Sequence, residues 1–230
     1  MPSETVIVVM AKQPKVGRTK TRLCPPFEPS EAAGLYEALM RDSLALASGL
    51  AEVDLAVAIT PPESRGYFRA VAPPGTRLLP VSGADIGECL ERSLAELLRL
   101  GYRRVLALNA DGPSLPVAYL REAVAALAAC DLVLGPGEDG GYYLVGLTHL
   151  HAPLFRGIIW STDQVLAQTV ERAQRLGLRI HLLPPWYDID TPADARRLAR
   201  ELPTLPPDRL PHTRAFLAGF ARPALFSSNT

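Results

Sequence analysis

Short apolar runs alternate with longer amphipathic segments along most of this 230-residue chain, and this alternation constrains the fold more than any other feature. Runs rich in valine, leucine, isoleucine and alanine, each followed by a turn, are typical of buried strands. We expect such strands at residues 5–9, 54–60, 78–81, 104–109, 131–135, 142–147 and 178–183, with helices between them. This order predicts an α/β protein in three layers (α/β/α), built around a mostly parallel, Rossmann-like sheet.

Three hydroxyl-bearing residues stand where helices are expected to begin. Serine and threonine side chains often accept a hydrogen bond from the first turn of a helix, and proline is favoured at its first position. The predicted caps are Ser30, Thr162 and Thr191. Residues 203–211 are rich in proline, so we expect one domain at 1–202 and an extension at 203–230, with one short helix and a frayed tail at 224–230.

Composition excludes several classes of partner. Twenty-four basic and 24 acidic residues give a formal net charge of zero, which argues against binding nucleic acid or an anionic membrane by bulk electrostatics. No apolar run approaches the roughly 20 residues of a membrane span, and the first residues lack a signal-peptide pattern. Cys24, Cys89 and Cys130 lack the spacing of a metal site and are interpreted as reduced thiols, so we expect a cytoplasmic protein.

The loop after the first strand is strongly basic. It contains Lys12, Lys15, Arg18, Lys20 and Arg22 and no acidic residue, and all three lysines of the chain lie in it. The carboxyl edge of an open α/β sheet is where ligands bind. A solvated charged loop is the alternative, but unpaired cations repel one another, and phosphate accepts both lysine and arginine. We therefore expect a phosphate-bearing ligand here.

Two common nucleotide motifs do not fit. The segment from Gly17 to Thr21 resembles the end of a P-loop, but position 12 is lysine where that motif requires glycine. The turn after the first strand also lacks the Gly-x-Gly-x-x-Gly pattern of dinucleotide-binding dehydrogenases.

Aspartates follow the fourth strand and precede the helix at Thr191. Asp111 is exposed by the Gly112-Pro113 turn that ends its strand, and Asp188 and Asp190 alternate onto one face of an extended segment. Carboxylates of this kind hold hard divalent cations that bridge to phosphates. Turn and helix-capping roles are the structural alternatives.

Two further turns combine glycine, aromatic and hydroxyl groups. Asp139, Gly140, Gly141 and Tyr142 suit a sugar or nucleotide, since glycine admits a close ligand and tyrosine offers a flat face. A hairpin with two core tyrosines at 142 and 143 explains the same residues. Trp160, Ser161 and Thr162 form a second such group, for which a helix cap is the alternative.

In combination these motifs resemble the DUF2064 proteins, which are similar to the glycosyltransferase-A, or nucleotide-diphospho-sugar transferase, superfamily and distantly to phospholactate guanylyltransferases. The motifs are Lys12-x-Pro14-x-x-Gly17-x-x-Lys20-Thr21-Arg22-Leu23, Gly83-x-Asp85-x-Gly87-Glu88, Asp111-x-Pro113, Glu138-Asp139-Gly140-Gly141-Tyr142-Tyr143, Trp160-Ser161-Thr162 and Tyr187-Asp188-Ile189-Asp190-Thr191-Pro192. The resemblance spans about residues 5–200. The family often has Cys-Pro-Asp after the strand that ends at Asp111, whereas this chain has Gly112-Pro113-Ser114.

The resemblance implies a site divided among several segments. Catalysis would involve Lys12, Lys20, Arg22 and Asp111, and the nucleotide would contact Ala11, Lys12, Gly17, Lys20, Arg22, Gly83, Asp85 and Gly87. Asp111 and Asp190 would hold Mg²⁺ or Mn²⁺, with Asp188 nearby. Substrate would lie against Asp139, Gly140, Gly141, Tyr142, Trp160, Ser161 and Thr162.

Three functions compete at this stage. The family resemblance favours a metal-dependent glycosyltransferase that uses a nucleotide-sugar donor and a small-molecule acceptor. The basic loop favours a nucleotidyltransferase that releases pyrophosphate, because such a reaction uses a phosphate-binding loop more fully. A nucleotide-binding regulatory protein without catalysis is the third interpretation, which the serine at position 114 permits.

Overall fold

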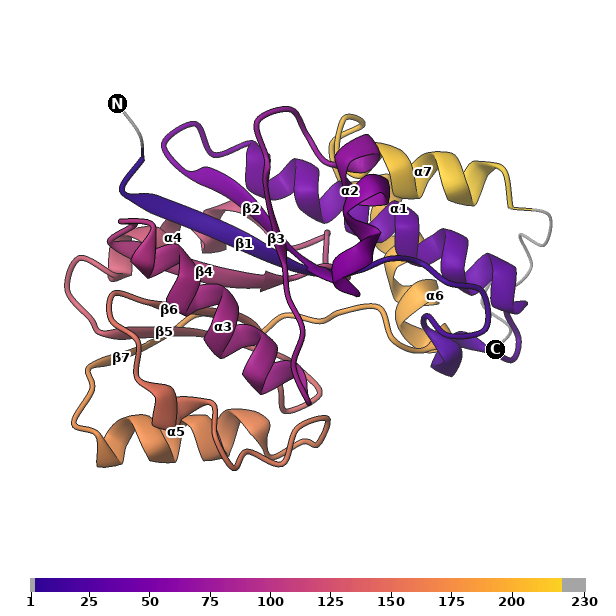
Figure 1. Ribbon diagram of the computed structural model, residues 1–230. Coiled ribbons are helices and arrows are strands. Elements are labelled where there is room, and N and C mark those ends of the chain that lie inside the picture. The colour runs from indigo at the N-terminus through magenta and orange to yellow at the C-terminus, as the bar shows by residue number, and fades with distance from the viewer. Residues whose placement is uncertain (1–2, 221–230) are drawn as a thin grey trace.

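A computed structural model describes residues 3–220, and these form one seven-stranded sheet with helices on both faces (Figure 1). The strands are β1 (Thr5–Lys12), β2 (Asp54–Thr60), β3 (Arg77–Pro80), β4 (Arg104–Asn109), β5 (Leu132–Pro136), β6 (Tyr142–Leu147) and β7 (Ile180–Leu182). The helices are α1 (Pro29–Ser48), α2 (Arg65–Val71), α3 (Ile86–Arg99), α4 (Val117–Ala126), α5 (Val165–Arg175), α6 (Pro192–Glu201) and α7 (Pro211–Ala218). Short 3₁₀ turns supplement them, including η1 (Thr21–Leu23).

The strand order is β3-β2-β1-β4-β6-β5-β7. Strand β6 runs antiparallel to its neighbours β4 and β5, and the remaining pairs are parallel. The predicted three-layer, mostly parallel sheet is therefore confirmed. Strand β5 runs in the same direction as β1 and β4, because β6 is antiparallel to both β4 and β5. The β5–β6 turn, at the carboxyl end of β5, therefore lies on the same edge of the sheet as the loops after β1 and β4.

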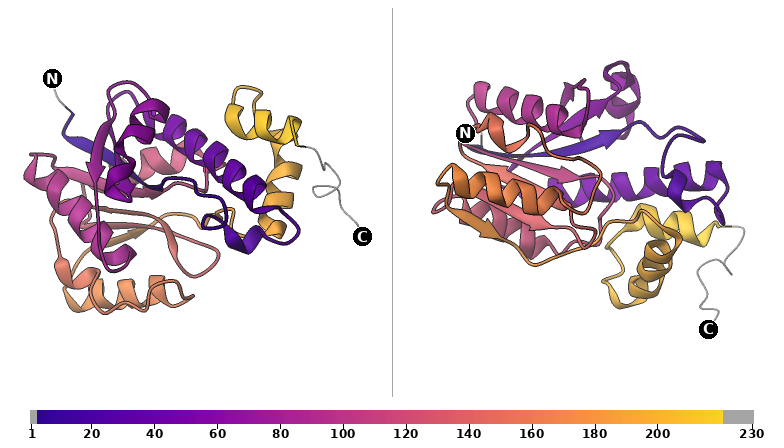
Figure 2. Two further views of the ribbon diagram at one scale, coloured as in Figure 1. Left: turned by 45° about the vertical axis from the view of Figure 1, so that its right-hand side comes forward. Right: turned by 90° about the horizontal axis from the view of Figure 1, so that it is seen from below.

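The alternation of side chains along β1 explains why both faces of the sheet are covered. Ile7 and Val9 belong to a core shared with α1, α2 and α4, whereas Val6 and Val8 belong to a second core shared with α3 and α5. Figure 2 shows helices on both sides of the sheet. Strand β1 also continues beyond its predicted end, because Lys12 still pairs with Thr60 of β2.

Two of the three predicted helix caps are wrong. Helix α1 begins at Pro29, before Ser30, and Glu28 precedes it, with the Glu28 N–H donating to the Glu31 carboxylate at 2.7 Å. Helix α5 begins at Val165, with Gln164 before it and no side-chain cap, and the Thr162 hydroxyl instead donates to the Ile159 carbonyl at 2.7 Å. The third prediction, Thr191, is confirmed as the cap of α6.

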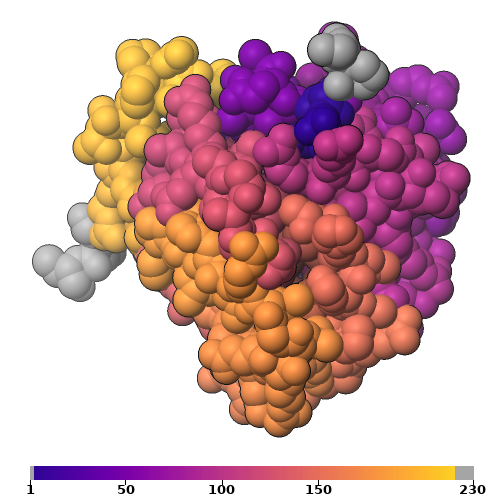
Figure 3. Space-filling model, turned by 90° about the vertical axis from the view of Figure 1, so that its left-hand side faces the viewer, coloured from indigo at the N-terminus to yellow at the C-terminus, as the bar shows by residue number. Residues whose placement is uncertain are grey.

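A third apolar cluster joins α6 and α7 to the first half of α1. The Phe216 ring of α7 packs so closely on α1 that a Cβ added at Gly34 would lie 2.9 Å from it. In Figure 1, α6 and α7 lie at the right of the molecule and α5 lies at the lower left, and in Figure 3 the yellow surface of the C-terminal segment lies at the upper left, above the orange surface. The frayed tail predicted at 224–230 lies outside the described residues.

Two further observations on the described residues concern the cysteines and the apolarity of the helices. Cys24, Cys89 and Cys130 are free thiols. None of the helices within residues 3–220 has the length and apolarity needed to cross a membrane.

Asp42 of α1 holds the beginning of α7. Its side chain is almost fully buried and accepts from the His212 N–H at 3.1 Å and from the Thr213 N–H at 2.7 Å. First-turn N–H groups have no acceptor within their own helix, so a carboxylate there accepts their hydrogen bonds. Its negative charge also interacts favourably with the positive end of the helix dipole. Asp42 thus caps a helix 170 positions away in sequence.

We expect Asp42→Ala to lower the free energy of unfolding by about 2–3 kcal/mol, because it leaves two buried N–H donors unpaired. Urea unfolding measures this change, and Asp208→Ala, at an exposed position, is the matched control with an expected change within about 0.5 kcal/mol. An Asp42→Ala variant as stable as the Asp208→Ala variant would contradict the assignment.

Candidate functional site

A cavity of about 600 Å³ opens at the carboxyl edge of the parallel strands. Its wall combines residues that are distant in the sequence, from the end of β1, the end of β4, the β5–β6 turn, the segment before α5 and the segment before α6. Among its lining residues are many of the predicted site residues: Lys12, Arg22, Asp111, Asp139, Gly141, Tyr142, Trp160, Ser161, Thr162, Asp188 and Asp190.

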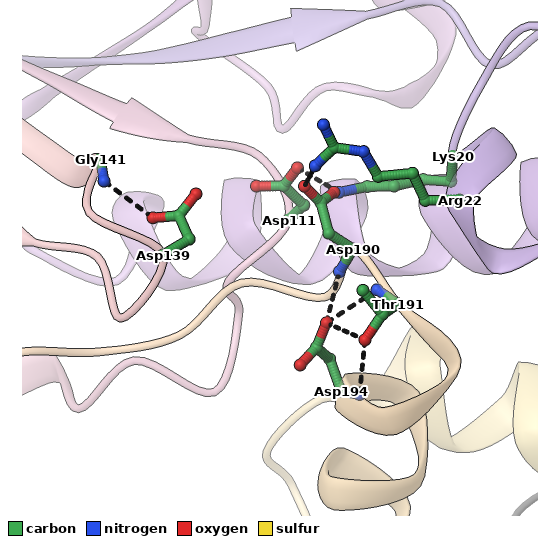
Figure 4. Close-up of polar contacts among 8 residues, drawn as sticks. All are labelled: Lys20, Arg22, Asp111, Asp139, Gly141, Asp190, Thr191 and Asp194. Carbon is green, nitrogen blue, oxygen red and sulfur yellow. Dashed lines mark hydrogen bonds and ion pairs between the residues drawn. The ribbon is translucent and has the colours of Figure 1, made fainter. Parts of the chain in front are cut away.

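Lys20 joins the basic loop to two of the carboxylates. Its ammonium contacts Asp111 Oδ2 at 2.6 Å and also donates to Asp190 Oδ1, and Arg22 lies 3.7 Å from the other oxygen of Asp190 (Figure 4). The Lys20 side chain is only 7% exposed. Burial opposes its charge, but the two carboxylates outweigh burial and raise the pKa of Lys20 above its ordinary value. The cationic loop and the distant aspartates therefore face each other in one site.

Asp111, Asp188 and Asp190 form a group of carboxylates that fits a hard cation. Each offers one oxygen, and these oxygens lie within 4.8 Å of one another. Burial, together with the charges of Asp111 and Asp190, raises the pKa of Asp188 to about 7. A divalent cation would remove this mutual repulsion, and oxygen-only ligands of this kind suit Mg²⁺ or Mn²⁺.

Backbone contacts fix the relative positions of these aspartates. The Ile189 N–H donates to the Asp111 carbonyl at 3.1 Å, and Ile189 itself is fully buried. Gly112 allows the two segments to approach, because a Cβ there would lie 3.1 Å from the Tyr187 carbonyl. Thr191 and Asp194 cap α6 directly after Asp190, as Figure 4 shows. The extended segment carrying Asp188 and Asp190 is thus held at both ends.

Ser114 contacts an aromatic residue of the cavity wall. It is buried and accepts a hydrogen bond from the Trp186 indole at 3.1 Å. The residue that replaces the resembled family's acid therefore orients a tryptophan of the cavity wall.

The opposite wall of the cavity comes from the β5–β6 turn and the segment before α5. The Asp139 carboxylate accepts from the Gly141 N–H at 2.9 Å, which fixes the turn (Figure 4). Gly140 has φ +86° and lies against the Asp163 backbone, where a Cβ would be 2.2 Å from the carbonyl oxygen. Of the two tyrosines, Tyr143 is buried and Tyr142 is partly exposed, and both line the cavity. The turn belongs to a hairpin, and ligand binding by these residues stays a prediction.

Other predicted residues lie outside the cavity lining. Ala11 is buried in β1, and Gly17, at φ +73°, lies in the open part of the basic loop. Asp85 caps α3 by accepting from the Glu88 N–H at 2.9 Å. Gly83 and Gly87 allow close packing, because a Cβ at Gly83 would meet Cys89 at 3.0 Å and one at Gly87 would meet the Trp160 ring at 2.4 Å.

Sequence reasoning missed several residues of the wall. Asn109 ends β4 two positions before Asp111, and Trp186 lies next to the aspartate segment; both line the cavity. The position of Asn109 at the end of a central strand could have identified it. Tyr36 of α1 was also missed: its buried hydroxyl accepts from the Lys12 N–H at 3.0 Å and anchors the start of the basic loop.

We expect Asp188→Asn to stabilise the metal-free protein at pH 8 by on the order of 2 kcal/mol. A pKa raised to about 7 means that the folded wild-type protein binds the Asp188 proton more tightly than the unfolded chain does. The free energy of unfolding of the wild type therefore falls as pH rises from about 4 to 7. Asparagine does not ionise and avoids that loss, so the advantage should shrink towards pH 5.

Thermal unfolding with a chelator at several pH values measures this difference, with Asp208→Asn as the exposed control. An advantage that is absent at pH 8, or larger at pH 5 than at pH 8, would contradict the described electrostatics.

The chain is similar to several known proteins. It is 29% identical over 204 residues to phosphoenolpyruvate guanylyltransferase of Sphaerobacter thermophilus, covering 86% of this chain and 95% of that protein. It superimposes on the crystal structure of a putative nucleotide-diphospho-sugar transferase from Desulfovibrio desulfuricans with a TM-score of 0.89 and 31% identity, covering 98% and 97% of the two chains.

More distant structures share the fold alone. CMP:2-keto-3-deoxy-manno-octonic acid synthetase in complex with CTP superimposes with a TM-score of 0.57 at 14% identity, covering 88% of this chain and all of that one. Rv0371c of Mycobacterium tuberculosis in complex with manganese gives 0.54 at 19% identity, covering 85% and 98%.

The family described as "Uncharacterized protein conserved in bacteria (DUF2064)" matches residues 44–162, more than half of the chain. With the fold, the order of the motifs and the 31%-identical structure, this match identifies the chain as a member of the DUF2064 family with a nucleotide-diphospho-sugar transferase fold.

Proposed function

We propose that this protein is a metal-dependent nucleotidyltransferase that transfers a nucleoside monophosphate from a nucleoside triphosphate to a small acceptor. The observation that carries the proposal is the meeting of two kinds of charge in one cavity: Lys12 and Arg22 line it together with the three clustered carboxylates. The similarity to a guanylyltransferase over most of both chains supports the same class of reaction.

The basic and the acidic residues of the site have different roles in this proposal. Lys12 and the exposed Arg22 would bind the phosphates, and Lys15 and Arg18 on the same exposed loop add to the positive potential. Asp111 and Asp190 would hold Mg²⁺ or Mn²⁺, with Asp188 beside them, and the bound ion would neutralise charge on the phosphates. Lys20 balances two of the carboxylates and keeps the loop against them.

Rate acceleration in this arrangement would come from positioning and electrostatic stabilisation. Phosphoryl-type transfer requires the attacking and leaving oxygens to lie in line and the developing charge to be neutralised. The cations at the end of β1 and in η1 would stabilise the departing pyrophosphate, while the β5–β6 turn and the segment before α5 would orient the acceptor.

Glycosyl transfer from a nucleotide sugar is the second candidate. It is favoured by the 31%-identical structure described as a putative nucleotide-diphospho-sugar transferase. The two reactions differ in their donor, since one requires a triphosphate and the other a diphosphate sugar. The cationic loop supports the triphosphate because that donor carries more negative charge.

Both tryptophans of the chain, Trp160 and Trp186, line the cavity, so intrinsic fluorescence can report binding directly. We expect nucleoside triphosphates with Mg²⁺ or Mn²⁺ to change the fluorescence at lower concentration than UDP-glucose, GDP-mannose or other nucleotide sugars. Tighter metal-dependent binding of a nucleotide sugar than of every triphosphate would instead favour glycosyl transfer.

Asp111→Asn should abolish the metal-dependent part of triphosphate binding, because the amide lacks the charge that holds a divalent cation. In the same fluorescence titration Asp208→Asn is the control and should match the wild type. Equal metal dependence in the Asp111→Asn and control variants would contradict the assigned metal site.

Arg22→Ala should weaken triphosphate binding about tenfold, the loss expected for one charge-assisted hydrogen bond. Thermal stability should change little, because the Arg22 side chain is 70% exposed and its ion pair with Asp190 is long. Arg121→Ala on α4 removes an exposed arginine away from the cavity and is the matched control. Binding that is equally strong in both variants would remove Arg22 from the site.

A further inference from the structure

One wall of the cavity carries acidic and apolar groups but no cation. We call it the hairpin–α5 wall: Asp139 and Tyr142 from the β5–β6 hairpin, and Trp160, Asp163 and Val165 from the start of α5 and the segment before it. Among the described residues that line the cavity, the basic ones are Lys12 and Arg22, which belong to the other wall. Residues 137–143 and 160–165 contain no lysine or arginine at all.

Trp160 provides a fixed flat surface in this wall. A Cβ at Gly87 would lie 2.4 Å from the indole, so the ring packs directly on the backbone of the first turn of α3. Tyr142 meets the same ring edge to face, with centroids 6.3 Å apart. A ring held from two directions loses little entropy when a ligand stacks on it. Ile86, which is exposed and also lines the cavity, adds apolar surface to the same site.

The charges of the site leave nothing to neutralise an anionic acceptor. Lys20 is already paired with Asp111 and Asp190. The proposed function assigns Lys12 and Arg22, the basic residues of the cavity lining, to the phosphates of the donor. An acceptor phosphate or carboxylate on the hairpin–α5 wall would face Asp139 and Asp163, and like charges in such contact cost several kcal/mol. Carboxylates accept hydrogen bonds only, so their natural partners are hydroxyl groups.

We propose that the hairpin–α5 wall binds an uncharged, hydroxyl-bearing acceptor with an apolar or flat face that stacks on Trp160. This substrate class rests on the proposed function. It excludes phosphoenolpyruvate, from which the guanylyltransferase relative takes its name, because that compound carries both a phosphate and a carboxylate.

The corresponding reaction is balanced. A hydroxyl oxygen of the acceptor forms a bond to the α-phosphorus of the donor, and the bond from that phosphorus to the bridging oxygen of the β-phosphate breaks. Pyrophosphate leaves with that electron pair, and the hydroxyl proton passes to solvent. The product is an uncharged compound joined to a nucleoside monophosphate through a phosphodiester.

A matched pair of probes tests the charge requirement. Phenyl β-D-glucoside and phenyl β-D-glucuronide share an aromatic ring and several hydroxyls and differ by one carboxylate. Calorimetric titration of the full chain with Mg²⁺ and inorganic triphosphate present should show the glucoside binding at least about tenfold more tightly than the glucuronide or phosphoenolpyruvate. Trp160→Ala should remove glucoside binding.

Asp163→Lys reverses one charge of the wall and should bring the glucuronide to at least the affinity of the glucoside, while Asp208→Lys should leave the preference unchanged. Glucuronide or phosphoenolpyruvate binding as tight as the glucoside in the wild type would overturn the proposal. So would an absence of glucoside binding, or equal effects of the two lysine variants.

The proposed function is read out separately, from the titration of triphosphate with Mg²⁺ alone. An absence of triphosphate binding in that titration would count against the nucleotidyltransferase. The selectivity between the glucoside and the glucuronide is therefore also measured without triphosphate. The two proposals can therefore fail independently.

Discussion

The ion pairs of Lys20 with Asp111 and Asp190 are the interactions on which the site depends. A nearly buried ammonium requires a counter-charge, because desolvating it alone is costly. Meeting that requirement draws together three segments: the loop after β1, the turn after β4 and the extended segment before α6. None of these segments is close to another in sequence. The pairs thus convert separate strand ends into one charged site.

The sheet topology makes this meeting possible. Parallel strands β1, β4, β5 and β7 deliver their carboxyl ends to one edge, and the antiparallel β6 returns the chain so that the β5–β6 turn faces the same cavity. The wall opposite the cations therefore comes from the β5–β6 hairpin and the segment before α5 rather than from a second basic loop. In the proposed function, this asymmetry would separate the binding place of the donor phosphates from that of the uncharged acceptor.

Much of the fold could be predicted from the sequence, because the apolar runs that predict strands are the segments that the structure buries. Strands β2, β4 and β6 have the predicted bounds, since each is a short apolar run closed by a turn. The approach of Lys20 to Asp190 could also be predicted, because a parallel sheet brings strand ends to a common edge.

Helix caps were harder to predict, because several neighbouring polar residues look equally suitable as a cap in the sequence. Glu28 precedes α1 in place of the predicted Ser30, and the Thr162 hydroxyl bonds to the Ile159 carbonyl in place of capping α5. The packing of Gly87 on Trp160 and the Trp186–Ser114 hydrogen bond join residues more than 70 positions apart, and no periodicity signals them.

The central claim is that the cationic loop and the carboxylates form one site for a metal-bound triphosphate. A crystal structure with Mn²⁺ and a non-hydrolysable nucleoside triphosphate, with the ion located by anomalous scattering, tests it most directly. We expect a manganese peak at Asp111 and Asp190, with the phosphates contacting Lys12 and Arg22. Manganese bound elsewhere, or phosphates away from the loop after β1, would contradict it.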